Sequence, residues 1–429
     1  MIKNLFLILF FILFANCSFY KAGFWTKEEK IVTVEKNNKL FEKEETLANE
    51  FNPNIKIELS LDREYSNKIN FNNFGPSKIN LTQKKISKLK FKKIDYFDQF
   101  EPELLFYKND IILFEKNGTL VRFGSDKEII WKVNHYNKNE KKIGPILKLT
   151  NYKDKVLVTD SLSKIHLIDT IDGSLLWSNE HRVSFISQIK IDNDKFYALD
   201  ANNTFNCFSL KDGNKLWEFK TEEKLINSQK QTSIVIDKDK VIFNNSKGEI
   251  IALDKDSGNL IWITPSISFD ESFQSFLLKS SDLVLDNENL YISNNRNNFY
   301  SLDVNTGLVN WRQNINSSLR SVIIDNVIFT ISDNGYLFVI EKDTGNIVRS
   351  TNVLSNFKQK KREKIKLTGF LVSSDKIYLT SNNGLLILIN IEDGKQDEIF
   401  KVSREKISKP YVNNESLYIV KDDQIIKIN

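Results

Sequence analysis

The sequence contains very little cysteine and histidine. Its 429 residues include two cysteines, Cys17 and Cys207, which are too far apart to indicate a disulfide framework or a metal cluster. Cys207 lies in the alternating run FNCFSL and is expected to be a small buried apolar residue. The histidines, His135, His166 and His181, fall in separate strands or loops without ligand spacing, so neither a zinc site nor a Ser-His-Asp triad is supported.

Loops that bind phosphate or calcium are also missing from the sequence. No Gly-rich phosphate-binding motif occurs. Asp254-x-Asp256-x-Gly258 resembles the start of a calcium loop, but the twelfth position, which needs a bidentate glutamate, is Pro265. We therefore expect these acids to be turn residues.

No concentration of charge of one sign stands out either. The net charge of +5 is small for this length, and the 27% of charged residues are well mixed in sign, which argues against a nucleic-acid binder. Stretches with helical periodicity are nearly absent. Hydrophobic residues make up 41% and aromatic residues 12% of the chain, which is enough for a packed core.

The one long apolar run, Leu5 to Ala15, is too short to cross a bilayer, which needs about 20 residues, and is expected to be a secretion signal. Cys17 follows it, and the stretch FANC resembles the lipobox of bacterial lipoproteins although Phe14 and Asn16 depart from the usual pattern. The resemblance implies that Cys17 is acylated and that the chain is anchored to the outer membrane, facing the periplasm. An ordinary signal with an accidental cysteine is the alternative.

The chain divides by composition into four parts. Residues 1–17 are the predicted signal peptide, and residues 18–53 are polar, with runs such as KEEK, and are expected to form a flexible tether. Residues 54–86 form an N-terminal extension with short strand-like pieces. Residues 87–429 contain repeated short strands separated by turn residues.

The clearest repeat runs from Lys240 to Trp262. It predicts a strand, a turn at Lys247-Gly248, a strand from Glu249 to Leu253, a turn from Asp254 to Gly258, and a third strand that carries Trp262. The end of this unit, acid-x-x-x-Gly-x-x-x-Trp, recurs along the chain. Its members are Asp169, Gly173, Trp177; Gly213 and Trp217 with Ser209 at the acid position; Asp254, Gly258, Trp262; and Asp303, Gly307, Trp311.

Weaker copies extend the repeat in both directions. Trp131 ends one copy, and Gly345 and Gly394 keep the turn but have Arg349 and Glu398 where the tryptophan is expected. A period of 40 to 49 residues between tryptophans, with several short strands in each period, is typical of a β-propeller blade. The motif has a structural explanation: glycine supplies a turn with positive φ, the acid accepts backbone hydrogen bonds, and the tryptophan packs between blades.

The number of strands predicts eight blades, each a four-stranded antiparallel sheet. Seven complete units are expected, and three strands remain at the C-terminus: Lys409 to Val412, Leu417 to Val420 and Ile425 to Ile428. A single unmatched strand, Leu89 to Ile94, precedes the first unit. Pairing these ends would complete an eighth blade, close the ring and remove exposed sheet edges. The seven units span residues 102–134, 143–180, 184–220, 231–264, 276–315, 319–353 and 366–402.

The acid-x-x-x-Gly-x-x-x-Trp motif, here called the docking motif, resembles that of the quinoprotein (PQQ-type) propeller repeats over residues 100 to 400. Two families share the repeat: quinoprotein alcohol and glucose dehydrogenases, and the BamB lipoproteins of the outer-membrane β-barrel assembly machinery. The leader with Cys17, the eight units, and the order SLDVNTGLVNW, VIEKDTGNIV and LYIVKDDQIIKIN resemble BamB. This resemblance implies a lipid-anchored propeller without catalytic activity or cofactor that binds the barrel-inserting subunit.

A dehydrogenase is the alternative that the shared repeat leaves open. The resemblance to those enzymes implies a quinone held by Arg, Trp and Thr, a Ca²⁺ ion held by Glu and Asn, a catalytic Asp and often a vicinal cysteine pair. That pair is impossible here, because Cys207 would be the only cysteine besides the anchor. A propeller that binds another envelope partner is a third possibility.

Two loops are candidates for binding. The connection from Thr264 to Asp286 is the longest, and its acids lie beside aromatic residues, as is common at contacts with partner proteins. In BamB-like proteins acidic loops of this half contact the barrel-inserting subunit. A self-packed loop is the alternative. The basic stretch Phe357 to Lys364 could meet anionic head groups, but a solvated loop is favoured. The predicted partner-binding residues are Phe269, Asp270, Glu271, Phe273 and Phe276.

Overall fold

The fold is taken from a computed structural model of the whole chain. It describes residues 49–59, 73, 76–77, 79, 81, 86–93, 97, 103–221, 230–267 and 277–429. All of them belong to one compact unit, Glu45–Asn429.

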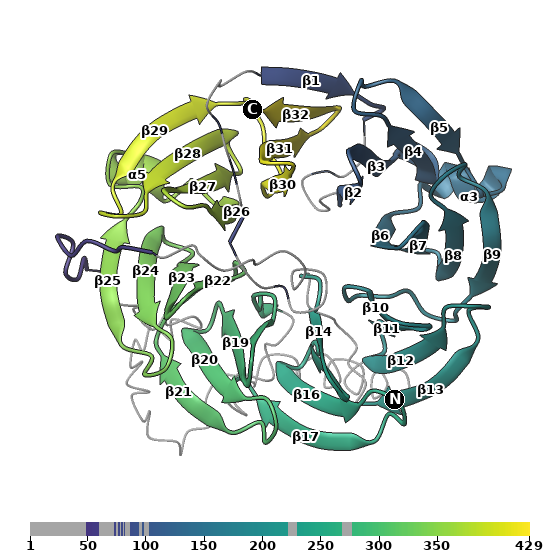
Figure 1. Cartoon of the computed structure of the whole chain (residues 1–429), viewed down its shortest axis with the longest axis horizontal. Helices are drawn as coiled ribbons and strands as arrows, with labels where there is room; N and C mark the ends of the chain where they lie inside the picture. The colour runs from purple at the N-terminus through teal and green to yellow at the C-terminus, as the bar shows by residue number, and fades with distance from the viewer. Residues whose placement is uncertain are drawn as a thin grey trace, which may run out of the picture. The chain divides into compact units, whose positions relative to one another are not determined.

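The described strands form eight four-stranded antiparallel sheets arranged as blades around an axis, as predicted (Figure 1). The first strand of each blade lies nearest the axis and the fourth forms the outer rim. Blades 1 to 4 consist of β2 (Leu105–Tyr107), β3 (Asp110–Glu115), β4 (Thr119–Phe123), β5 (Ile129–Val133); β6 (Leu147–Tyr152), β7 (Lys155–Asp160), β8 (Lys164–Asp169), β9 (Leu175–Glu180); β10 (Lys190–Asp192), β11 (Lys195–Leu199), β12 (Thr204–Ser209), β13 (Lys215–Lys220); and β14 (Ile234–Asp237), β15 (Lys240–Asn244), β16 (Glu249–Asp254), β17 (Leu260–Pro265).

The remaining blades follow the same order, except that blade 8 takes its outer strand from the N-terminal side of the chain. Blades 5 to 8 consist of β18 (Val284–Asp286), β19 (Asn289–Asn294), β20 (Asn298–Asp303), β21 (Val309–Gln313); β22 (Val322–Ile324), β23 (Val327–Ile331), β24 (Tyr336–Glu341), β25 (Ile347–Asn352); β26 (Leu367–Val372), β27 (Lys376–Ser381), β28 (Leu385–Asn390), β29 (Gln396–Lys401); and β30 (Tyr411–Asn413), β31 (Ser416–Lys421), β32 (Gln424–Ile428), β1 (Ile86–Lys90).

The burial of the strands follows their position in the blade. All residues of β15 are buried, because a central strand packs on both faces against neighbouring blades. Outer strands alternate instead, as in β13, where exposed residues alternate with half-buried ones. The hydrophobic clusters therefore lie between adjacent blades. One of them joins Tyr197 and Cys207 of blade 3 to Val241 and Phe243 of blade 4.

Closure of the ring is confirmed, but the predicted bounds of the closing strand are wrong. The strand is Ile86–Lys90 rather than residues 89–94, and it pairs antiparallel with β32 from Ile86 opposite Ile428 to Lys90 opposite Gln424. The alternating pattern up to Ile94 was misleading because the hairpin at Asp422-Asp423 ends the partner strand. Only one further hydrogen bond, from Phe91 N to Asp423 O at 3.0 Å, continues the ladder among the described residues.

Helix is scarce, as predicted. Among the described residues, α3 (Lys138–Ile143) lies between blades 1 and 2, where Asn137 and Glu140 form a capping box. The stretch Phe357 to Lys364 contains one helical turn, α5 (Gln359–Arg362), and a 3₁₀ turn, η2, spans Lys116–Gly118. In the part of the chain that the structure describes, no helix combines the length and the apolar character needed to span a bilayer.

Candidate functional site

At the six junctions from blade 1 to blade 7 the docking motif joins one blade to the next through the turn between the third and fourth strands, here called the outer turn. Trp262 of blade 4 donates from Nε1 to Val304 O of blade 5 at 3.0 Å. Thr264, two residues later, donates to Gly307 O at 2.6 Å. Gly307 has φ +72°, and a Cβ atom there would lie 2.6 Å from the indole ring of Trp262. The glycine therefore provides both the left-handed turn and room for the ring.

The acid of the motif organises the outer turn from within. Asp254 Oδ1 accepts hydrogen bonds from the backbone N–H of Asp256 at 3.1 Å and of Ser257 at 2.7 Å. The hydrogen bonds from Ser257 lower the pKa of Asp254 below its ordinary value. Oδ1 of Asp254 is thus used in hydrogen bonds within the turn, as expected of a turn acid, and Asp256 Oδ1 accepts from Lys195 Nζ of blade 3 at 2.7 Å.

The same contact recurs at five further junctions between blades. Other indole donors are Trp131 to Thr170 O at 2.8 Å, Trp177 to Leu210 O at 3.0 Å and Trp311 to Lys342 O at 3.0 Å. Trp131 packs on Gly173, Trp177 on Gly213, Trp217 on Gly258, Trp311 on Gly345, and Arg349 on Gly394.

The junction between blades 3 and 4 keeps the ring contact without the hydrogen bond. Nε1 of Trp217 is buried and has no partner. The expected acceptor, Lys255 O, accepts instead from the hydroxyl of Tyr197 at 3.1 Å. Phe205 of blade 3 and Phe243 of blade 4 stack with their centroids 4.1 Å apart, so this junction relies on aromatic packing.

Arg349 stands at a tryptophan position and takes over its hydrogen bond. The side chain is fully buried, and Nη2 donates to Ile391 O of blade 7 at 3.0 Å, the acceptor equivalent to that of the tryptophans. Nη1 donates to Glu392 O and, at 3.0 Å, to Ile55 O. Burial lowers the pKa of Arg349. The arginine therefore joins blades 6 and 7 and also holds a segment from the N-terminal part of the chain.

This segment, residues 50–58, is here called the strap. Phe51 forms an antiparallel bridge with Ser350 in β25, with hydrogen bonds of 3.0 and 2.8 Å, and Ile57 N donates to Glu392 O at 2.9 Å. Lys56 and Glu392 form an exposed ion pair at 2.6 Å. The last residues of the range predicted as a tether thus lie against blade 6.

A second described piece of the N-terminal extension lies at the axis. Asn73 is buried; its Nδ2 donates to Ser233 Oγ at 3.1 Å and to Leu283 O at 2.9 Å, and its Oδ1 accepts from Lys190 Nζ at 2.9 Å. These partners belong to blades 3 and 4 and to the strand entering blade 5. Burial lowers the pKa of Lys190 to about 7.

The residues that line the axial channel show whether this protein could hold the quinone and Ca²⁺ of the dehydrogenases. A cavity of about 440 Å³ there is lined by two acids, Glu103 and Asp282, among several cations. Burial raises the pKa of Asp282, but the nearby Lys230, Lys409 and Arg320 more than offset this, so it lies below its ordinary value. A Ca²⁺ site needs several oxygen ligands. Because cations already surround Asp282, and because the described residues contain no cluster of three or more His, Cys, Asp or Glu side chains able to hold a metal, these residues do not fit that ion. The cations of the channel are Lys148, Lys230, Arg320, Lys406 and Lys409.

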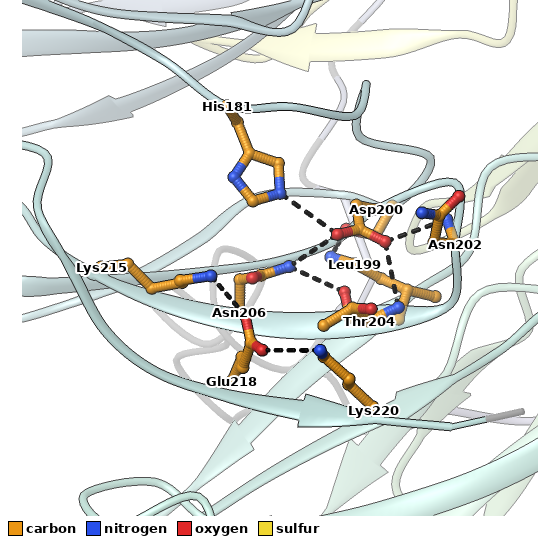
Figure 2. Close-up of polar contacts among 10 residues, drawn as sticks. His181, Leu199, Asp200, Asn202, Thr204, Asn206, Lys215, Glu218 and Lys220 are labelled. Atoms are coloured by element: carbon orange, nitrogen blue, oxygen red, sulfur yellow. Dashed lines mark hydrogen bonds and ion pairs between the residues drawn. The ribbon is translucent and has the colours of Figure 1, made fainter. Parts of the chain in front are cut away.

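A second repeated hydrogen-bond motif lies in the turn between the second and third strands. It was not predicted from the sequence. Figure 2 shows it in blade 3: Asp200 Oδ1 accepts from the backbone N–H of Asn202 at 2.9 Å and of Thr204 at 3.0 Å, and Oδ2 lies 3.1 Å from His181 Nε2. The equivalent residue always lies nine positions before the acid position of the outer turn, a spacing that could have been found in the sequence. These residues are Asp160, Asp200, Asn245, Asn294, Ser332 and Ser381.

The fold brings together two of the three histidines that the sequence left apart. The rings of His135 and His166 lie 6.5 Å apart, and His166 also meets Tyr136 edge to face. Both ring nitrogens of His166 are buried without a hydrogen-bond partner. Burial, with a smaller effect of His135, lowers the pKa of His166 to about 4.

His166 is expected to make the protein less stable in mild acid. Its folded-state pKa lies below the ordinary value of 6.5, so the stabilisation is complete above about pH 6.5 and is lost as the pH falls toward 4. Between pH 7 and pH 5 the loss from this residue should be about 2 kcal/mol. Chemical denaturation of the parent and of His166→Leu at both pH values measures it. An equal loss in both proteins would contradict this assignment.

The predicted partner-binding residues lie outside the described part of the chain. Residues 268–276 hold all five of them, and Cys17 is likewise not described. The described residues at the two ends of the connection are hydrogen-bonded: Ser266 N donates to Gly248 O at 2.7 Å, and Asn295 Nδ2 donates to Leu277 O at 3.0 Å. Cys207 is buried, and burial raises the pKa of its thiol to about 12, as suits an inert core residue.

The blade architecture and its tryptophan contacts define a propeller built from PQQ-type repeats. The sequence model of one family, described as outer membrane protein assembly factor BamB, matches residues 116–351. That is more than half of the chain, and the chain belongs to this family.

Individual relatives are distant. The chain is 19% identical over 274 residues to the outer membrane protein assembly factor BamB of Moranella endobia (strain PCIT), covering 63% of this chain and 68% of the relative. It is 21% identical over 342 residues to an uncharacterized protein of Rickettsia prowazekii (strain Madrid E), covering 76% and 81%.

Solved structures share the fold at still lower identity. BamB from Moraxella catarrhalis has a TM-score of 0.65 at 14% identity, covering 80% of this chain and 99% of that one. The quinohemoprotein alcohol dehydrogenase from Comamonas testosteroni has a TM-score of 0.59 at 9% identity, covering 80% and 76%. At these identities the likeness concerns the fold alone.

Proposed function

We propose that the chain is a non-enzymatic outer-membrane lipoprotein that binds the barrel-inserting subunit of the β-barrel assembly machinery and assists insertion of outer-membrane proteins. The observation that carries this proposal is the family match over residues 116–351 in a ring of eight blades. The cation-rich axial channel, which does not suit a Ca²⁺-bound quinone, supports a binding role over the dehydrogenase alternative.

In this proposal the N-terminal part of the chain connects the propeller to the membrane. An acylated Cys17 holds the protein at the periplasmic face of the outer membrane, and the polar residues after it give reach. The strap ends this tether at blades 6 and 7, because Phe51 pairs with Ser350 and Arg349 holds Ile55 O. A force on the tether would therefore act on these contacts with blades 6 and 7.

The proposed partner surface is the connection between β17 and β18. Asp270 and Glu271 lie beside Phe269, Phe273 and Phe276, a combination that gives apolar anchors and charge complementarity to a basic partner. The described residues that flank it are held to blades 4 and 5 by hydrogen bonds of Ser266 and Leu277. Nascent outer-membrane proteins are proposed as additional binding partners.

The test is co-purification of the barrel-inserting subunit from bacterial envelopes. The double variant Asp270→Lys, Glu271→Lys is expected to lower its recovery at least tenfold, since close like charges across an interface oppose binding. The matched control is Asp343→Lys with Glu405→Lys, which changes the net charge equally at exposed positions elsewhere. The control should recover the subunit as well as the parent does.

Two results would contradict this proposal in different ways. Unchanged recovery with the double variant would exclude the chosen connection as the contact. Failure of the parent chain itself to recover the subunit, including after crosslinking in intact envelopes, would exclude the function.

A further inference from the structure

Neither junction of blade 8 has the docking motif, and at the junction with blade 7 the reason is topological. Blade 8 is completed by two chain segments, β32 ending at Ile428 and β1 beginning at Ile86, so it has no outer turn. Glu398 of blade 7 stands at the tryptophan position in β29 but has no outer turn ahead of it on which a ring could pack. The usual filling of the space between blades is therefore missing here.

A cavity of about 830 Å³ occurs between blades 7 and 8. This is within the range of about 300–1,000 Å³ that is typical of ligand sites. Its walls come from facing sides of the two sheets and belong to one hydrophobic cluster, which also includes Ile79 of the N-terminal extension. The apolar wall residues include Tyr378, Leu388 and Phe400 of blade 7 and Ile426 and Ile428 of blade 8.

Charged groups of both signs lie among the lining residues. Lys88 of β1, Lys376 of β27 and Lys401 of β29 line the cavity. Lys376 pairs with Asp397 at 2.8 Å, and Lys401 donates to Asn383 O. Asp375 and Glu415 also contribute. Burial, with a smaller effect of Asp375, raises the pKa of Tyr378 to about 12, so its phenol is a hydrogen-bond donor at neutral pH.

The other junction of blade 8 provides a comparison within the same molecule. The cavity between blades 8 and 1 measures about 390 Å³, and several of its lining residues are amides and hydroxyls, among them Asn109, Ser125, Asn414 and Asn429. Both junctions lack the docking motif, but the cavity between blades 7 and 8 is about twice as large, and eight of its sixteen lining residues are aliphatic, against three of twelve at the other junction. The larger cavity therefore has the room and the aliphatic wall that an alkyl chain needs.

We propose that the cavity between blades 7 and 8 binds a long-chain fatty acid, with the alkyl chain between the two sheets and the carboxylate at Lys88 or Lys401. An alkyl chain needs no hydrogen bonds from aliphatic walls. A peptide, in contrast, would bury backbone N–H and C=O groups against them without partners, which costs free energy. Lys88 supplies a cation for the carboxylate, and the Tyr378 hydroxyl is a further hydrogen-bond donor among the lining residues. This inference goes beyond the proposed function and does not rest on it.

The test uses the full purified chain and the fluorescent fatty acid cis-parinaric acid. Saturable binding of one molecule per chain is expected, with displacement by palmitate. Ile86→Trp should weaken binding at least tenfold, because Ile86 lines the cavity and is 58% exposed, so a larger side chain blocks the entrance without disturbing the core. Ile129→Trp is the matched control: it is 51% exposed on the outer strand β5, away from the cavity, and should bind as the parent does.

Charge and filling variants complete the test. Lys88→Glu should weaken palmitate at least threefold while leaving the uncharged hexadecanol unaffected. Leu388→Trp should abolish binding because the larger side chain fills the cavity. Circular dichroism and the melting temperature show whether this variant folds. If it does not fold, the result with Ile86→Trp alone tests the inference. Absence of saturable binding to the parent, or equal binding by Ile86→Trp and Ile129→Trp, would overturn the inference. So would displacement of the probe by apolar peptides but not by palmitate.

Discussion

Trp262→Ala is expected to lower the free energy of unfolding by roughly 3–5 kcal/mol. The change removes a large buried side chain from between blades 4 and 5 and leaves Val304 O without its 3.0 Å donor. It also leaves the left-handed turn at Gly307 facing an empty space, because the indole ring is its nearest contact. Denaturation in urea, followed by circular dichroism and by fluorescence of the remaining tryptophans, measures the loss.

Trp217→Ala is the matched comparison. Trp217 packs on Gly258 as Trp262 packs on Gly307, but its Nε1 has no acceptor. Its removal should therefore cost about 1 kcal/mol less, the typical net value of one hydrogen bond. If both variants lose the same free energy, the indole hydrogen bonds contribute nothing measurable and the stability of the junctions comes from ring packing alone.

Arg349→Met is expected to destabilise the protein by about 3 kcal/mol. The carbonyl oxygens of Ile55, Ile391 and Glu392 would lose a charged donor inside the structure, and unpaired buried polar groups cost about 1–3 kcal/mol each. Arg349→Trp, by contrast, restores the residue found at the equivalent position of five other blades. It should keep most of the stability because an indole can fill the space on Gly394 and donate to Ile391 O.

The two variants at position 349 share one further expected result. Neither side chain can hold Ile55 O, so the strap should detach in both. Hydrogen exchange reports this directly, since the amides of Phe51 and Ile57 donate to Ser350 O and Glu392 O in the parent. Lys56→Ala is the control, because its ion pair with Glu392 is exposed and such pairs contribute little. Retained protection in Arg349→Trp would show that the strap does not depend on the guanidinium.

The strands and blades could be predicted because their signals are local. The outer turn from Asp254 to Gly258 combines a glycine with positive φ and an acid that accepts nearby N–H groups, and these residues lie within a few positions of each other. The eight-blade ring followed from counting such units and from the leftover strands at the two ends. The closing strand was misplaced by three residues at its start because its register is set by β32, more than 300 residues away.

The departures from the repeat could not be interpreted in this way. Arg349 and Glu398 both look like a lost tryptophan in the sequence, but the first binds a segment almost 300 residues distant and the second faces a blade without an outer turn. The predicted partner-binding residues, Phe269 to Phe276, are not described by the structure and remain a prediction.

The sequence by itself determined the blade repeat, the closed ring and the family, because a period of strands and turn residues is set by backbone preferences over short distances. Only the tertiary structure decided that Asn73 lies at the axis, that His166 is buried beside His135, and that a large cavity lies between blades 7 and 8. These features depend on which segments, far apart in the sequence, come into contact when the ring closes. A local pattern of residues does not determine such contacts.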